Sequence, residues 1–132
     1  MWWGVSLKKS EVISEFIKLV ENTQKEYQVS LDYVTLFDKE LQDIIHKAEL
    51  EKLSQSEKAK LTTWLSRNRK DRRYWKNKFD ENAPLYDYIQ SSKEFKNVIE
   101  QLKQVLGKVR KAEKYLEERK YKPRTNFGQG DE

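Results

Sequence analysis

The apolar residues of the N-terminal third recur mostly at steps of three and four residues, and this spacing constrains the fold more than any other feature. They are Ile13, Phe16, Ile17, Val20, Tyr27, Leu31, Val34, Phe37, Leu41, Ile44, Ile45 and Ala48. Residues at this spacing share one face of an α-helix. No Gly or Pro interrupts the run, so the sequence predicts one long helix over about 10–53, with Ser10 as its N-cap. A turn at 28–32 is the alternative, because Ser30 or Asp32 could cap a second helix.

A second helix is predicted to begin directly after the first. Ser54 and Glu57 have the spacing of a capping box, in which each side chain bonds to the backbone of the other residue. So short a junction favours antiparallel packing of the two helices, and the sequence therefore predicts a helical hairpin. The second helix is expected to run to about Phe79.

The next stretch contains residues that commonly end and restart helices. Asn82 could cap, and Pro84 suits the first turn of a short helix over 85–90. Ser91 and Glu94 then have the spacing of another capping box. A C-terminal helix is predicted to follow, because apolar residues again keep helical spacing at Phe95, Val98, Ile99, Leu102, Val105, Leu106, Val109, Ala112, Tyr115 and Leu116.

The composition limits the fold class and the cell compartment. The 132 residues are enough for a single helical domain over 1–132. Charged residues make up 37% of the chain, with only four Gly and two Pro, which favours long helices with narrow apolar faces. Such faces bury little area, so we expect a homo-oligomer that completes the core. The lack of cysteine excludes disulfides, and the lack of a long apolar run excludes a membrane span. No signal peptide pattern is present at the start, so the expected location is the cytoplasm.

Positive charge is concentrated in two regions. Residues 64–79 hold seven Lys or Arg residues against one acid, Asp71, for a net charge of +6. Residues 108–124 have a net charge of +5, which leaves −6 on the rest of the chain. Two cationic regions on an otherwise acidic chain indicate an anionic partner.

Within the first basic region, helical spacing places Arg72 on the same stripe as apolar residues. Burial of an unpaired charge is costly, so this guanidinium is expected to pair with either a carboxylate or a bound anion. In an antiparallel hairpin Asp38 would lie across from this region and could pair with Arg69 or Arg72. The remaining basic residues face too few acids for all of them to be paired.

The sequence offers little for catalysis or for a metal. Asp43, His46 and Glu49 lie at steps of three on the first predicted helix, but His46 is the single histidine of the chain. A metal site of this type needs further ligands from other helices, so a structural role is expected instead. There is also no nucleophile motif and no glycine-rich phosphate loop. We therefore expect a protein that is not an enzyme and uses neither a metal nor a cofactor.

The segment after the last predicted helix has the residue types of a nucleotide site. Pro123 favours an extended backbone here. Arginines such as Arg124 bind phosphate, Thr125 and Asn126 can bond to polar edges, and the neighbouring aromatic residues can stack on a base. A basic tail anchored by one or two aromatic residues is the alternative.

Three stretches together resemble the type 1 Thoeris anti-defence family of phage proteins. They are Asp38 to Leu50, the Arg69 to Lys76 stretch RKDRRYWK, and the ending Arg119 to Arg124. The resemblance implies a homo-oligomer with ligand sites between protomers. Such proteins bind and sequester a cyclic ADP-ribose isomer, an anionic signalling nucleotide, without cleaving it.

On that analogy, Arg72 and Arg124 would contact phosphate. Phe95 or Tyr88 would stack on the ligand, and Asn97 or Asn126 would make polar contacts. Two alternatives stay open: a nucleic-acid-binding helical protein that uses the basic helix 64–79, and a coiled-coil structural scaffold.

Overall fold

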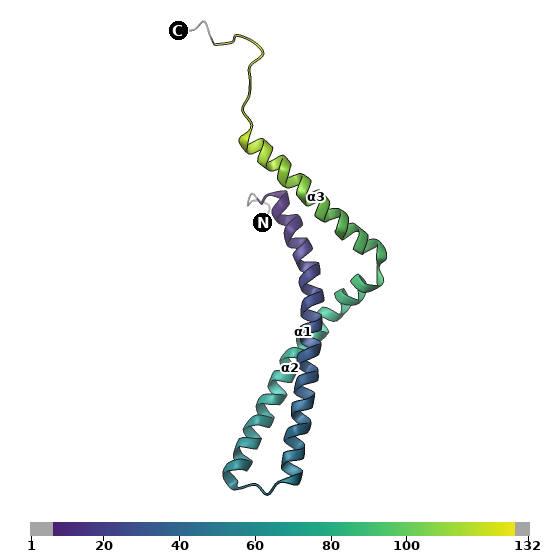
Figure 1. Ribbon diagram of the computed structural model, residues 1–132, viewed down its shortest axis with the longest axis vertical. Coiled ribbons are helices and arrows are strands. Elements are labelled where there is room, and N and C mark those ends of the chain that lie inside the picture. The colour runs from purple at the N-terminus through teal and green to yellow at the C-terminus, as the bar shows by residue number, and fades with distance from the viewer. Residues whose placement is uncertain (1–6, 129–132) are drawn as a thin grey trace.

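The computed structural model describes residues 7–128 and consists of helices joined by short connections. These are α1 (Lys9–Leu50), α2 (Gln55–Ser91) and α3 (Lys93–Glu118), and the described part of the chain contains no strand (Figure 1). The predicted mainly helical fold is therefore confirmed. Residues 119–128 follow α3 without a further helix. None of the helices in this part is long and apolar enough to cross a membrane.

α1 is a single helix through 28–32, so the alternative of a turn there is wrong. Ser30 is fully buried, and its hydroxyl donates a hydrogen bond to the backbone carbonyl of Glu26 within the same helix. The start differs from the prediction, because Lys8 is the N-cap residue and Ser10 lies buried inside the first turn. No side chain caps this end.

The capping box at the start of α2 is confirmed. The backbone N–H of Glu57 donates to the Ser54 hydroxyl at 3.2 Å, and the Ser54 backbone N–H donates to the Glu57 carboxylate at 3.5 Å. These two bonds satisfy donors that the first turn of a helix would otherwise leave unpaired.

The predicted end of this helix near Phe79 is wrong, because α2 continues through Pro84 to Ser91. Asn82 does not cap a new helix; its amide donates to the Lys78 carbonyl at 2.8 Å. A proline in a helix interior costs about 3 kcal/mol. Packing after Pro84 offsets this cost: Ile89 is only 1% exposed, and Tyr86 stacks on Tyr27 of α1 with ring centroids 3.7 Å apart.

The connection from α2 to α3 is shorter than predicted. Ser92 alone separates them and is the N-cap of α3, its hydroxyl accepting from the Phe95 N–H at 3.1 Å. The expected capping box of Ser91 with Glu94 is therefore wrong, and the Ser91 hydroxyl instead donates to the Tyr88 carbonyl. A single extended residue turns the chain sharply at this corner.

The three helices form two parts. At the closed end the first half of α1, the last part of α2 and α3 meet, and the open arm contains only the second half of α1 and the first part of α2 (Figure 1). α2 runs back beside α1, crosses it and diverges, and α3 returns towards the start of α1 (Figure 1). The Lys8 ammonium donates to Glu117 at 2.8 Å, which ties the start of α1 to the end of α3. This hydrogen bond lowers the pKa of the Glu117 carboxyl below its ordinary value of 4.5. The Lys103–Glu21 pair, at 3.4 Å, holds α3 to α1 further along.

The apolar core is thin and lies where the three helices meet. Val20, Ile89 and Ile99 form its centre, one from each helix, and Leu85, Phe95 and Leu102 pack around them. Aromatic pairs continue the contact between α1 and α2 towards the open arm: Tyr27 with Phe79 and Tyr33 with Trp75, with ring centroids 4.8 and 4.4 Å apart. Aromatic pairs of this kind add stabilisation beyond their buried area.

One buried amide fixes how α1 and α2 align. Asn68 is fully buried, and its amide nitrogen donates to the Phe37 carbonyl at 2.9 Å and to the Glu40 carboxylate at 3.0 Å. Its oxygen accepts from Arg69 Nε and Nη2 at 3.1 and 2.9 Å. Both N–H donors and the acceptor oxygen are therefore satisfied. A shift of one helix along the other would break the two bonds to α1.

We expect Asn68→Ala to lower the free energy of unfolding by about 1–3 kcal/mol, because it removes these bonds and leaves buried groups without partners. Urea denaturation followed by circular dichroism measures this change. Asn77→Ala is the matched control, since Asn77 is exposed on the same helix, and its effect should stay within about 0.5 kcal/mol. Equal losses for both variants would contradict the role given to Asn68.

Candidate anion-binding surface

Arg72, which was predicted to contact a phosphate, forms an ion pair within the chain. Its Nε lies 2.6 Å from Oδ1 of Asp38 on α1. The Arg72 side chain is 26% exposed and that of Asp38 is 51% exposed, so the pair lies at the edge of the α1–α2 contact. The sequence allowed two kinds of partner for this guanidinium, a carboxylate or a bound anion, and the structure shows the carboxylate.

Arg69 is also engaged within the protein. Its guanidinium donates two hydrogen bonds to the side-chain oxygen of the preceding residue, Asn68. Lys76 pairs with Asp80 one turn further along α2, with Nζ 3.0 Å from Oδ1. Three of the seven basic residues in 64–79 are therefore held by groups of this chain.

The other four basic residues differ in their distance from α1, since Arg67 and Lys78 line hollows that residues of α1 also line. Within residues 7–128, no carboxylate lies within ion-pair distance of Arg67, Lys70, Arg73 or Lys78. Helical spacing places Lys70 and Arg73 opposite to Asn68, and Arg67 and Lys78 on one flank of the helix. We define the outer face of α2 as these four residues together with Thr63, Ser66, Tyr74 and Asn77.

The outer face combines charge, hydroxyl groups and an exposed aromatic ring. Part of it is a shallow, open hollow of about 460 Å³, lined by Thr62, Thr63, Ser66, Arg67, Lys70 and Asp71. The ring of Tyr74 is more than half exposed, and the Lys78 ammonium lies 5.8 Å from its centroid. Cations and hydroxyls bind phosphate oxygens, and an exposed ring can stack on a base. Asp71 opposes an anion at one edge.

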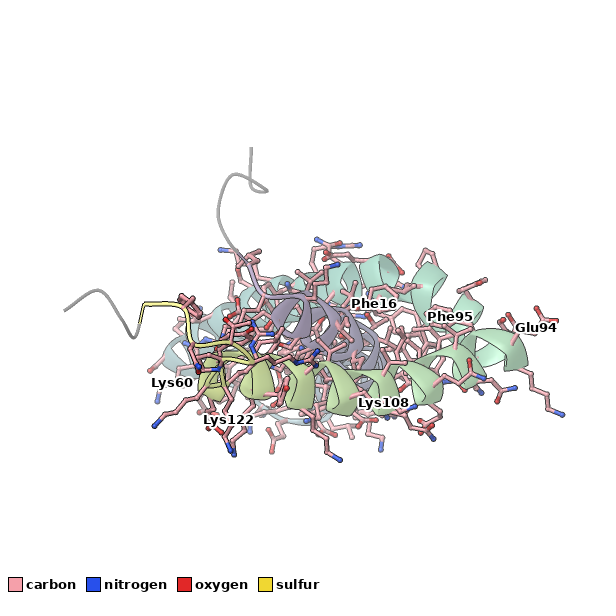
Figure 2. All side chains as sticks on the ribbon, turned by 90° about the horizontal axis from the view of Figure 1, so that it is seen from above. Phe16, Lys60, Glu94, Phe95, Lys108 and Lys122 are labelled. Atoms are coloured by element: carbon pink, nitrogen blue, oxygen red, sulfur yellow. The ribbon has the colours of Figure 1, made fainter. Side chains whose placement is uncertain are left out.

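A second group of predicted residues meets at the corner between α2 and α3. The rings of Tyr88 and Phe95 are 5.3 Å apart, and Phe95 also meets Phe16 of α1 edge to face at 6.4 Å (Figure 2). A cavity of about 250 Å³ beside them is lined in part by Phe95, Asn97, Lys96 and Lys103. Glu21 and Glu100 also line it, so its charge is mixed.

The structure does not bring Arg72 and Arg124 together within one chain. Arg124, Thr125 and Asn126 lie on the segment after α3 and are exposed. This segment leaves the molecule from the end of α3, far from the middle of α2 (Figure 1). The predicted site between two copies therefore stays a prediction, and one chain alone supplies only parts of it.

Sequence reasoning gave the outer face of α2 too little weight. The sequence predicts that some basic residues of this region lack acids, but the apolar stripe singles out Arg72 rather than Arg67, Lys70 or Arg73. The signal was available in the spacing: Thr63, Ser66, Lys70, Arg73 and Asn77 recur at steps of three and four with no apolar residue among them. Such a pattern marks the side of a helix that stays in water.

The histidine region forms no metal centre in the part of the chain described. His46 lies on the exposed surface of α1, with Nδ1 3.7 Å from the Glu49 carboxylate. No group of three or more potential ligands gathers there or elsewhere among residues 7–128.

Comparisons with known proteins add no relative to this picture. No family model, no curated protein and no solved structure matches the chain. The resemblance to the Thoeris anti-defence family therefore stays a prediction.

We expect the Asp38–Arg72 pair to contribute modestly to stability, because it is only partly shielded from water. A double-mutant cycle of Asp38→Ala and Arg72→Ala should give a coupling free energy of about 0.5–1 kcal/mol that falls as salt is raised. The matched control is the cycle of Asp38→Ala with Arg73→Ala, in which no coupling is expected. A coupling near zero in the first cycle would mean that Arg72 is available to a ligand.

Proposed function

We propose that this protein binds nucleic acid through the outer face of α2 and does not convert it chemically. The observation that carries the proposal is a group of four basic residues on one long helix, Arg67, Lys70, Arg73 and Lys78, that form no ion pair within residues 7–128. All of them except Lys78 are exposed. Phosphate contacts from such residues supply most of the affinity of sequence-independent binding. The proposal places the protein in the cytoplasm, where nucleic acid is available.

The shape of the surface favours a polymer over a small molecule. Sites for small ligands are concave and bury most of the ligand, whereas the hollow on α2 is shallow and open. From Thr63 to Lys78 the outer face extends about 22 Å. This length matches about six phosphates of one strand, at roughly 3.4 Å for each. The hydroxyls of Thr63 and Ser66 and the amide of Asn77 add neutral donors for phosphate oxygens.

The proposal uses α1 and α2 as an antiparallel helical hairpin. In this arrangement α1 occupies one side of α2 through Asn68 and the aromatic pairs, and it leaves most of the outer face exposed to solvent. A surface held on a rigid helix loses little conformational entropy on binding. The proposal also includes self-association into a homo-oligomer, which would place more than one basic face on the same strand.

We expect binding to weaken roughly a hundredfold between about 50 and 200 mM salt, because four phosphate contacts release about four counterions. Fluorescence anisotropy of labelled single-stranded and duplex DNA and of RNA measures the affinity. The triple variant Arg67→Ala, Lys70→Ala, Arg73→Ala should lose most of the affinity and most of the salt dependence.

The matched control removes the same charge elsewhere, with Lys9→Ala, Lys39→Ala and Lys93→Ala, all exposed and outside the outer face. It should keep most of the affinity. Equal losses in the two triple variants would show that only net charge matters, and the absence of binding to all the oligonucleotides at low salt would reject the proposal.

The second candidate is the sequestering of a cyclic ADP-ribose isomer in the host cytoplasm, as a phage anti-defence protein. It is supported by the meeting of Tyr88, Phe95 and Asn97 at one corner, in addition to the resemblance of the sequence. Two adjacent rings can stack on an adenine, and the cationic tail around Arg124 of a second copy would have to supply the phosphate contacts.

For this candidate, we expect calorimetry with ADP-ribose isomers and cyclic nucleotides to show binding that Tyr88→Ala and Arg124→Ala each reduce at least about tenfold, because each removes a stacking or charged contact. Tyr115→Ala serves as the control, since Tyr115 is also an exposed aromatic residue and lies near the other end of α3. If none of these ligands releases or absorbs heat on titration, the sequestering function is rejected.

A further inference from the structure

One side of the α1–α3 pair carries apolar side chains that this chain leaves in water. Val12, Phe16 and Leu19 on α1 and Val98 and Val105 on α3 are each between 40% and 53% exposed. We call these five residues the apolar face. Single exposed apolar residues are common on protein surfaces, but a contiguous group marks a contact with another molecule.

Helical spacing places the five residues on the same side of the two helices. Val12, Phe16 and Leu19 follow each other at steps of four and three, and Val98 and Val105 are separated by seven. The Lys103–Glu21 pair bridges the helices on the other side. Phe16 meets Phe95 across the two helices, so the α1 strip and the α3 strip adjoin (Figure 2).

The chain also leaves far more surface in water than its size requires. It exposes 11154 Å². A compact monomer of 16.0 kDa is expected to expose about 7,400 Å². The extended arrangement of the helices and the exposed segment 119–128 both contribute to the excess. A stable protein interface needs about 800 Å² from each partner. The unburied area is therefore ample for one such contact.

The two strips match each other in length and chemistry. Each spans eight residues, with a rise of about 10 Å along the helix, and none of the five members is polar or charged. A twofold axis between two copies would set the α1 strip of one copy on the α3 strip of the other, and the reverse. A twofold contact requires self-complementarity of this kind, because the same patch serves both partners. A second copy of the chain therefore fits the face without any further component.

We propose that two copies of this chain associate through their apolar faces, the α1 strip of each packing on the α3 strip of the other. This inference specifies the surface for the self-association that the proposed function includes. The outer face of α2 takes no part in it. The contact buries the side chains that flank the thin core at Val20, Ile89 and Ile99, and so extends that core across the dimer.

Sedimentation equilibrium at protein concentrations up to about 100 µM tests the proposal, a range in which contacts of this size are populated. We expect the wild-type protein to have twice the chain mass of 16.0 kDa. Leu19→Glu and Val105→Glu should each return it to the chain mass with the helical circular dichroism retained, because both positions are about half exposed and a charge there would be buried only in the dimer.

The matched control is Leu36→Glu, which places the same charge at a 52% exposed leucine of α1, about 25 Å further along the helix. It should leave the dimer intact. Should the glutamate variants lose helicity, the double variant Val98→Thr, Val105→Thr keeps the side-chain shape. It should raise the dimer dissociation constant at least about tenfold, since each buried hydroxyl costs on the order of 1–3 kcal/mol.

A wild-type protein that stays at the chain mass over the whole concentration range would overturn the inference. Face variants that retain the dimer with full helicity would overturn it too, as would dissociation by the control alone. The two proposals can be rejected separately. A protein that is monomeric but binds oligonucleotides would reject only the dimer. A protein that is dimeric but binds no oligonucleotide would reject only the proposed function.

Discussion

The side-chain amide of Asn68 fixes the relation between the two long helices, and the other features of the molecule follow from that relation. Apolar stripes can slide past each other with little change in energy, because their contacts are not directional. The two hydrogen bonds from Asn68 to Phe37 and Glu40 of α1 permit one register. In that register Tyr33 stacks on Trp75 and Tyr27 contacts Phe79 at a tilt, so the aromatic contacts reinforce the alignment that the amide specifies. A buried polar group that selects one alignment among several is a known device in paired helices.

The same register divides the basic residues of α2 into two sets. Arg69 is bound by Asn68 and Arg72 by Asp38, because both arginines flank the side of α2 that meets α1. Helical geometry places Lys70 and Arg73 on the opposite side, and Arg67 flanks the contact without an ion pair to any of residues 7–128. The internal pairs therefore orient the outer face without using its charges. A basic stretch that looks uniform in the sequence is divided between structural and solvent-facing roles.

The sequence predicted the features that depend on neighbouring residues. The unbroken stripe of α1 and the Ser54–Glu57 capping box lie in short stretches of chain, and both appear as expected. The pairing of Asp38 with Arg72 was one of two predicted options, because distance from the loop limits which residues can meet. The continuation of α2 through Pro84 was not predicted. It depends on the burial of Ile89 against Val20 of α1, a contact distant in the chain that no local pattern reveals.

The division of the molecule into a closed end and an open arm determines how it would meet a long ligand. The contacts of α3 lie at the closed end, whereas the N-terminal part of α2, with the beginning of its outer face, lies on the arm (Figure 1). A pair of molecules joined at their closed ends would hold two arms at a fixed separation. Engagement of one arm then raises the effective concentration of the same strand at the other arm, which strengthens binding without any new contact. Such avidity would favour strands long enough to span both arms over short fragments.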